Sequence, residues 1–106
     1  MSTIAVDFDG VIHNEYDVDP GRRMGKPFPG AKENLSRYEG EGHAIIVHTL
    51  RGKDPKHVED WLDYFGIPYH DVTNKKPDAD VFIDNRGLYH QDWDSTDIEL
   101  KRRGLV

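Results

Sequence analysis

Apolar residues along the chain gather in short runs that alternate with polar segments rich in glycine or proline. Three of these runs, at residues 3–6, 44–47 and 81–83, are almost continuously apolar and predict buried strands. A weaker strand is expected at residues 67–72, where Pro68 favours a position at the edge of a sheet.

Two segments between the strands have the spacing of amphipathic helices. Residues 31–38 place their large apolar side chains on one face, and Gly40 and Gly42 are expected to end this helix. Residues 58–65 carry apolar side chains at i, i+3, i+4 and i+7, the strongest helical pattern in the chain. Asp54 is the expected N-cap of this second helix, with Pro55 at its first position and Gly66 as its carboxyl-terminal cap.

A third and shorter helix is expected near the carboxyl terminus. Thr96 and Glu99 are spaced as a capping box, and Gly104 follows where a helix would end. Strands that alternate with helices predict an α/β fold with a mostly parallel sheet. At 106 residues, the chain is expected to form a single domain spanning residues 1–106.

Composition narrows the classes of function. The net charge of −6 disfavours general binding along nucleic acid, which relies on lysine and arginine. The absence of cysteine excludes disulfides and thiolate metal sites. No apolar run approaches the roughly 18 residues of a membrane span, and the N-terminus does not resemble a secretory signal. We therefore expect a cytoplasmic protein without a membrane partner.

Polar residues follow the three apolar strands directly. Because parallel strands deliver their carboxyl ends to one edge of a sheet, these side chains are expected to meet there. They are Asp7 and Asp9, then Thr49 and Arg51, and finally Asp84 and Asn85.

Asp7 and Asp9 form the one Asp-x-Asp pair that directly follows an apolar strand and precedes a glycine. Two carboxylates so close repel each other, and a divalent cation such as Mg²⁺ would relieve the repulsion. Asp84 could supply a further carboxylate, so we expect these three acids to converge. An ionised aspartate beside a metal can attack phosphorus, while a second carboxyl group handles the proton.

These stretches resemble motifs of the haloacid dehalogenase (HAD) superfamily of phosphohydrolases. The first is Asp7-Phe8-Asp9-Gly10-Val11-Ile12, and the second is Ile45-Ile46-Val47-His48-Thr49, followed by Arg51. Lys76-Pro77 resembles the third motif, and residues 81–86 resemble the fourth. The four occur in the family's order, so the resemblance implies a small, Rossmann-like (HAD-like) phosphatase domain with helices flanking the sheet.

The resemblance also implies roles for individual residues. Asp7 would be the nucleophile and a magnesium ligand, and Asp9 the general acid/base, with its backbone carbonyl on the metal. Thr49 would hold the phosphoryl oxygens, and Lys76 would neutralise the nucleophile and the phosphate. Asp84 would be the remaining metal carboxylate.

Two departures from the family pattern stand out. The fourth motif often has two adjacent acids, whereas the second position here is Asn85, which can hold a metal-bound water without adding charge. The interval from Lys76 to Asp84 is too short for the helix that many members place there, so Lys76 must come from a loop, and Lys75 is a rival for its role. The family's fifth strand is expected to be missing or vestigial.

Residues 13–30 are polar and rich in proline and glycine, which predicts a loop or an irregular hairpin. They match the family's flap, a segment that covers the active site. Arg23 and Lys26 in this segment, together with Arg51 and the backbone of Gly10, are the candidate substrate-binding groups.

No segment is long enough for the cap domain that selects substrates in many members. Specificity must then come from the flap or from a neighbouring subunit, and a homo-oligomer is one hypothesis. The leading function is hydrolysis of a small phosphorylated substrate. A phosphatase acting on polynucleotide ends, a phosphoryl-accepting signalling domain and a catalytically silent phosphate-binding module are the alternatives.

Overall fold

A parallel sheet runs through the centre of the computed structural model, which describes residues 1–18, 24–50, 55–84 and 88–106. The strand order is β5-β4-β1-β6-β7, and every pairing between neighbours is parallel. The bounds are β1 Thr3–Asp7, β4 Ala44–His48, β5 Asp71–Thr73, β6 Val81–Asp84 and β7 Leu88–Tyr89. The predicted α/β class with a mostly parallel sheet is confirmed.

The three strongly apolar runs form the three central strands, as predicted. The weaker strand does lie at an edge of the sheet, but its predicted bounds of 67–72 are wrong. Pro68 lies before β5, and Ile67 is buried in the core cluster. β7 has only two residues, which agrees with a vestigial fifth strand.

The helices in the described part of the chain are α1 (Ala31–Gly40), α2 (Lys56–Phe65) and α3 (Trp93–Arg102). None of them has the length and apolar character needed to cross a membrane. Gly66 ends α2 at φ 70°, as predicted. α1 ends at Gly40, and the chain turns at Gly42 with φ 92°, so the predicted end of this helix at the two glycines is confirmed. Asp54 lies outside the described residues.

The predicted capping box at Thr96 and Glu99 is wrong. The N-cap of α3 is Asp92, four residues before Thr96, and its carboxylate accepts a hydrogen bond from the Ser95 N–H at 2.7 Å. Thr96 lies inside the helix, where its hydroxyl is 2.6 Å from Nδ1 of the buried His90. Burial lowers the pKa of His90, so this imidazole is neutral at pH 7.

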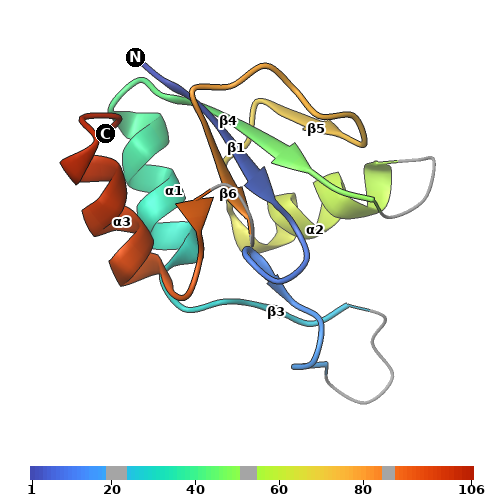
Figure 1. Cartoon of the computed structure of the whole chain (residues 1–106). Coiled ribbons are helices and arrows are strands. Elements are labelled where there is room, and N and C mark those ends of the chain that lie inside the picture. Colours follow the sequence, from blue (N-terminus) through green and yellow to red (C-terminus); the bar gives the residue numbers. More distant parts are fainter. Residues whose placement is uncertain (19–23, 51–54, 85–87) are drawn as a thin grey trace.

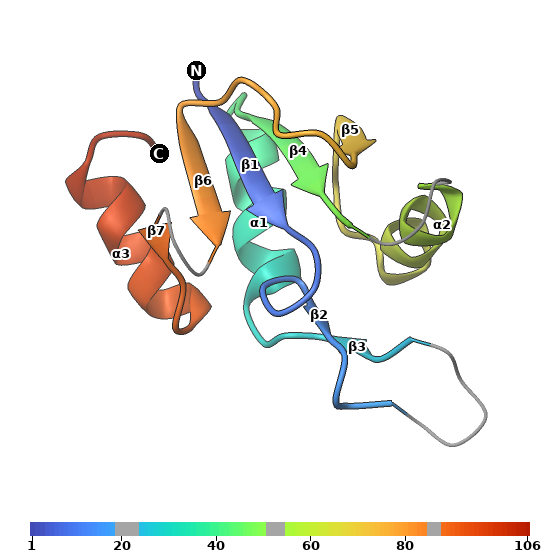
Figure 2. The same cartoon turned by 45° about the vertical axis from the view of Figure 1, so that its right-hand side comes forward.

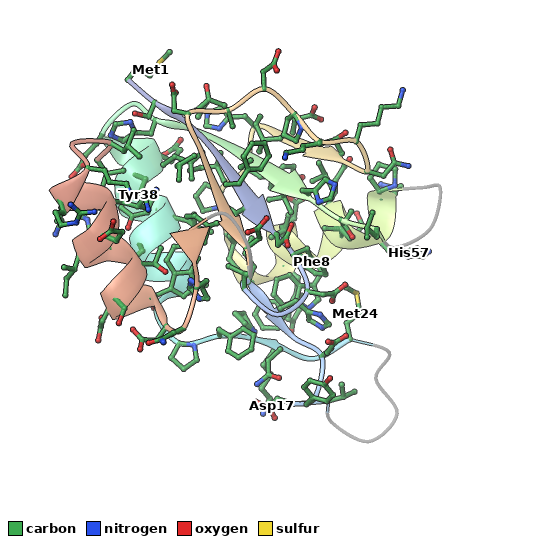
Figure 3. All side chains as sticks on the ribbon, in the orientation of Figure 1. Met1, Phe8, Asp17, Met24, Tyr38 and His57 are labelled. Atoms are coloured by element: carbon green, nitrogen blue, oxygen red, sulfur yellow. The ribbon has the colours of Figure 1, made fainter. Side chains whose placement is uncertain are left out.

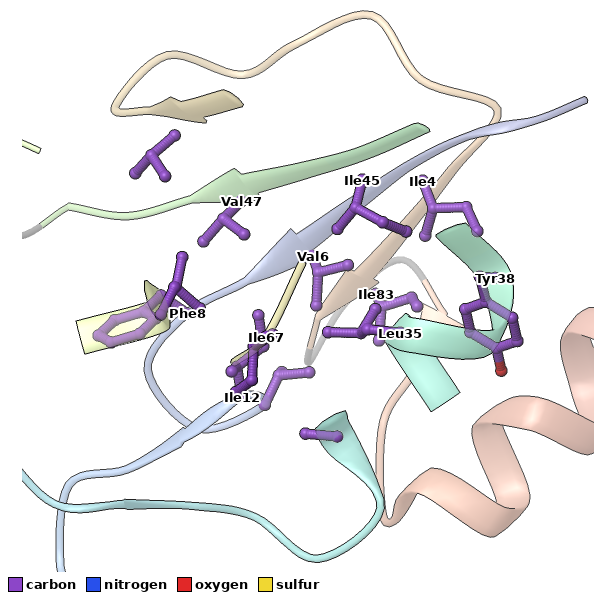
Figure 4. Packing of buried hydrophobic residues seen from close by; sticks show 14 of the residues in the cluster. Ile4, Val6, Phe8, Ile12, Leu35, Tyr38, Ile45, Val47, Ile67 and Ile83 are labelled. Atoms are coloured by element: carbon purple, nitrogen blue, oxygen red, sulfur yellow. The ribbon is translucent and has the colours of Figure 1, made fainter. Parts of the chain in front are cut away.

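One face of the sheet forms the hydrophobic core with the helices. Alternate residues of the central strands point to this face, and Figure 4 shows them directed toward Leu35 and Tyr38 of α1. Apolar side chains of α2 and α3 join the same cluster, including Leu62 and Leu100. In Figure 1, α1 and α3 lie side by side. The buried members of the strands are Ile4, Val6, Ile45, Val47, Val81 and Ile83.

The opposite face is covered less completely. In β4, the buried residues alternate with half-buried ones, among them Ile46 and His48. Residues 74–80 connect β5 to β6 without a helix, as the short interval after Lys76 predicted. Asp80 fixes the end of this connection, because its carboxylate accepts a hydrogen bond from the Thr3 N–H at 2.6 Å.

A small antiparallel hairpin projects from the carboxyl end of the sheet. It is formed by β2 (His13–Asn14) and β3 (Lys26–Pro27), with His13 opposite Pro27 and Asn14 opposite Lys26. Figure 2 shows it leaving the sheet beyond the end of β1, on the side away from α3. The prediction of an irregular hairpin within residues 13–30 is therefore confirmed for the described part of that segment.

Asp97 of α3 links α1 to α3. Its Oδ1 accepts hydrogen bonds from the Tyr38 hydroxyl at 2.7 Å and from Arg37 at 2.5 Å, and its Oδ2 lies 2.9 Å from Lys101 Nζ. Burial, followed by the hydrogen bond to Asp97, raises the pKa of Tyr38 far above its ordinary value. The hydroxyl therefore remains a donor at neutral pH.

We expect Tyr38→Phe to lower the free energy of unfolding by about 1 kcal/mol, because it removes one hydrogen bond to a charged acceptor that keeps its other partners. Chemical denaturation at neutral pH measures the change. Tyr64→Phe is the matched control, since Tyr64 is 72% exposed, and it should change stability by less than about 0.5 kcal/mol. Equal effects of the two substitutions would contradict the role given to Asp97.

Candidate active site

The parallel register aligns polar residues in one row across the carboxyl ends of the strands. Asp7 of β1 pairs with His48 of β4, and His48 pairs with Thr73 of β5. On the other side of β1, Val6 pairs with Ile83, so the next position in the same register sets Asp7 beside Asp84. Residues paired in register point to the same face of a sheet, which brings these side chains together.

Asp7 lies at the centre of this row, and the charges of neighbouring side chains affect its ionisation. Its Oδ1 lies 3.2 Å from His48 Nδ1, and its side chain is 38% exposed. Burial is the largest effect on the Asp7 carboxyl group, and the negative charges of Asp84 and Asp9 act in the same direction. Together they raise the pKa of Asp7, although the contact with His48 opposes the shift. A nearby cation would favour the ionised carboxylate.

A tight turn follows β1 and positions Asp9. The carbonyl oxygen of Phe8 accepts hydrogen bonds from the N–H groups of Ile12 and His13, at 3.0 and 2.8 Å. Gly10 has a φ of 85°, a conformation that favours glycine. The Gly10 N–H donates to the His13 carbonyl oxygen at 3.0 Å, so this predicted phosphate donor already has a partner within the turn.

The Asp9 side chain contacts His13, the first residue of the hairpin. Asp9 Oδ1 lies 2.7 Å from His13 Nδ1. The Asp9 side chain is 30% exposed, whereas the His13 side chain is 1% exposed. The carboxyl group is therefore accessible on one side and held by a buried imidazole on the other.

A pocket of about 160 Å³ opens between the end of β1 and the end of β4. Three of the predicted site residues line it together, and its walls are Asp7, Phe8, Asp9, His48, Thr49 and Leu50. A larger pocket of about 400 Å³ lies between the hairpin and α2, in the region of Met24 and His57 (Figure 3). Its lining is mainly aromatic and contains none of the predicted catalytic groups, so the smaller pocket is the candidate active site.

Thr49 and Lys76 approach this region from two other segments. Thr49 directly follows the last residue of β4 and is buried, and its N–H donates to the Thr73 carbonyl oxygen at 2.9 Å. Lys76 Nζ lies 4.8 Å from the centre of the Phe82 ring. Phe82 and Asp84 are two residues apart on β6 and share a face, so Lys76 lies on the face that carries Asp84. For Lys75, the backbone N–H donates to Thr73 Oγ1.

The remaining predicted residues divide into two groups. Lys26 is exposed on β3 of the hairpin. Arg23, Arg51 and Asn85 lie outside the described residues, so the roles suggested for them stay predictions.

The oxygen-rich character of the row suits a hard cation such as Mg²⁺. Within the described ranges, no three histidine or acidic side chains are arranged to hold a metal ion. The ligand set implied by the family resemblance has two carboxylates, from Asp7 and Asp84, together with the backbone carbonyl of Asp9. Asn85, the further predicted metal residue, lies outside the described residues. The Asp9 carboxylate is turned toward His13 instead. The donor chemistry therefore fits Mg²⁺ bound by two carboxylates and a carbonyl.

No histidine was named as a site residue from the sequence, yet two histidines contact the acids of the site. His48 contacts Asp7, and His13 contacts Asp9. The signal for His48 was present, because His48 directly follows the strand predicted at residues 44–47. The signal for His13 was weaker, since its position depends on the turn and the hairpin.

Comparison with curated proteins gives one distant relative. A Chlorobaculum tepidum protein named "Putative 5'(3')-deoxyribonucleotidase" is 30% identical over 84 residues, which cover 73% of this chain and 40% of the relative. The chain therefore spans less than half of the length of the curated relative that it matches. No family model matches the chain.

Among solved structures, a conserved protein of Bacteroides thetaiotaomicron is similar to this chain. The TM-score is 0.76 and the sequence identity 28%, and the match covers 96% of this chain and 91% of that protein. The agreement over almost the whole of both chains supports the α/β fold described above.

Asp7→Asn should stabilise the metal-free protein at neutral pH. Because the folded-state pKa of Asp7 is raised, its contribution to stability is present below the ordinary value of 3.8 and is lost as the pH rises through the folded-state pKa. The amide cannot ionise, so it avoids this loss. Denaturation with chelator present, at pH 7 and again below the ordinary value, measures the difference between variant and wild type.

The gain from Asp7→Asn should shrink as the pH falls, since Asp7 is then protonated in both states. A variant that is less stable than wild type at pH 7 would contradict the unfavourable electrostatic environment described for this carboxylate.

Proposed function

We propose that this chain is a phosphatase of the HAD type, which hydrolyses a phosphomonoester through an aspartyl-phosphate intermediate and requires Mg²⁺. The observation that carries the proposal is the meeting of Asp7, Asp9 and Thr49 in one pocket at the carboxyl edge of a parallel sheet. The name of the Chlorobaculum tepidum relative independently favours phosphate-ester hydrolysis.

The first half of the reaction uses both acids of the turn. A carboxylate oxygen of Asp7 attacks phosphorus, and the bond between phosphorus and the leaving oxygen breaks. Asp9 gives its proton to the leaving oxygen, so the alcohol departs neutral. Asp7 then carries the phosphoryl group, and Asp9 is ionised.

The second half releases phosphate. Ionised Asp9 takes a proton from water as the water oxygen attacks phosphorus, and the bond to Asp7 breaks. Asp7 returns as a carboxylate and Asp9 returns protonated, which completes the cycle.

The remaining groups neutralise charge and hold the phosphate. Thr49 suits the phosphoryl oxygens, and Lys76 supplies positive charge on the face that carries Asp84. Asp7, Asp84 and the Asp9 carbonyl would hold Mg²⁺, whose charge would offset the burial and the carboxylate repulsion that raise the pKa of Asp7. When bound, the metal supplies charge stabilisation to the phosphoryl group in the transition state.

The substrate is proposed to be a nucleoside monophosphate. The name of the curated relative points to nucleotides, whereas the net charge of −6 opposes binding along a polynucleotide. The competing hypotheses for the function are a phosphatase acting on polynucleotide ends and a catalytically silent phosphate-binding module.

Asp7→Asn should reduce hydrolysis of an aryl phosphate by at least about a thousandfold, because an amide cannot form the phosphorylated intermediate. Initial rates with saturating Mg²⁺ provide the measurement. Asp94→Asn is the control of identical chemistry, on the exposed first turn of α3, and should keep the wild-type rate. Wild-type activity in Asp7→Asn would refute the assignment of the nucleophile.

A chelator should abolish hydrolysis, and added Mg²⁺ should restore it, because the two carboxylates need a counter-charge. On a panel of substrates, we expect kcat/KM for deoxyribonucleoside monophosphates to exceed that for sugar phosphates. It should also exceed that for oligonucleotides phosphorylated at the 3′ or 5′ end. A preference for the oligonucleotides would favour the polynucleotide reading, and binding of phosphate without turnover would favour the silent module.

A further inference from the structure

His13 is enclosed by aromatic rings that fix the plane of its imidazole. Its ring stacks on Phe8 with 4.9 Å between centres and 4° between planes, and it meets the Trp61 ring edge-on at 5.3 Å. The residue is fully buried. An imidazole held in this way presents its two nitrogens in fixed directions.

Both ring nitrogens have partners, and the partners determine the tautomer. The Gly25 N–H lies 2.7 Å from Nε2, and because a backbone N–H can only donate, Nε2 must be the acceptor. In the neutral ring the proton is then on Nδ1, which donates to Asp9 Oδ1 at 2.7 Å. The hairpin thus sets the tautomer that holds Asp9.

Gly25 is itself fixed on both sides of its backbone. Its carbonyl oxygen accepts a hydrogen bond from Trp61 Nε1 at 3.0 Å, while its N–H donates to His13. A Cβ at this position would lie 1.9 Å from the carbonyl oxygen of Asn14, so only glycine fits. The partner of His13 Nε2 therefore has little freedom to move.

We propose that His13 is a positioning residue, which joins the hairpin to the Asp9 carboxyl group and holds that group in the orientation needed for proton transfer. The inference rests on the proposed function and deepens it. His13 touches neither substrate nor the reacting atoms, since Asp9 stands between the buried imidazole and the pocket.

Two amide variants separate the two hydrogen bonds of His13. The amide nitrogen of asparagine stands two bonds from Cβ, as Nδ1 does, so His13→Asn can still donate to Asp9 but loses Gly25. The amide oxygen of glutamine stands three bonds from Cβ, as Nε2 does, so His13→Gln can still accept from Gly25 but loses Asp9. Trp61→Phe is a third variant, which removes the other bond to Gly25 and keeps an aromatic ring.

We expect His13→Gln to lower kcat by about 10- to 100-fold with KM nearly unchanged, because a misplaced acid/base slows the chemical step. His13→Asn should retain most of kcat, and so should Trp61→Phe. Steady-state kinetics with a nucleoside monophosphate and with an aryl phosphate measure the split. Equal kcat values for the Gln and Asn variants would overturn the inference, as they would indicate a purely structural role.

A second measurement does not depend on activity. In the wild-type protein, ¹⁵N NMR of the imidazole should show a protonated Nδ1 and an unprotonated Nε2 for His13. The opposite tautomer would overturn the inference even if every variant failed to fold. Absence of hydrolysis by the wild-type protein would instead overturn the proposed function, so the two failures can be told apart.

Discussion

Repulsion between carboxylates is the constraint around which the carboxyl edge of the sheet is organised. The strands end at the same level, so in-register pairing sets the acid of β1 beside that of β6 and beside the histidine of β4. Burial adds to the cost of ionising Asp7. Without a counter-charge this arrangement lowers the stability of the folded domain, and the proposed Mg²⁺ and phosphoryl group would give each charge a partner.

Two acids that are only two residues apart at this edge each contact a different histidine. His48 reaches Asp7 across the β1–β4 pair, while His13 reaches Asp9 from the start of the hairpin. Their environments also differ, since the His13 side chain is buried and that of His48 is 22% exposed. Each acid is therefore held by a different structural element, although both leave the same strand.

The central sheet could be predicted from the sequence because continuous apolar runs such as 44–47 leave few alternatives to a buried strand. Because parallel strands bring their carboxyl ends to one edge of a sheet, the same runs predict that Asp7, Thr49 and Asp84 lie at that edge. The start of α3 was harder, because Thr96 and Glu99 fit a capping box as well as Asp92 fits an N-cap. Burial of Thr96 against His90 decided between them, and no local pattern carries that information.

The contact between Asp9 and His13 was beyond sequence reasoning for a similar reason. It depends on the turn at Gly10 and on the hairpin that returns Gly25 to the imidazole. Polar side chains on a short loop can point in several directions, and aromatic neighbours from α2 select one. The position of Lys76 has a simpler explanation. The seven residues 74–80 connect β5 to β6, which lie on opposite sides of β1, and so short a connection can follow few paths across the sheet.

The backbone anchor at Gly25 would allow the proposed chemistry and the choice of substrate to evolve separately. Gly25 contributes only main-chain atoms to its two hydrogen bonds, which require glycine at this position and the side chains of His13 and Trp61 as partners. Exposed positions of the hairpin such as Lys26 could then change while the contacts of Gly25 with His13 and Trp61 stay the same. A lineage could retune which molecules it accepts through the outward side of the hairpin while inheriting the reaction intact.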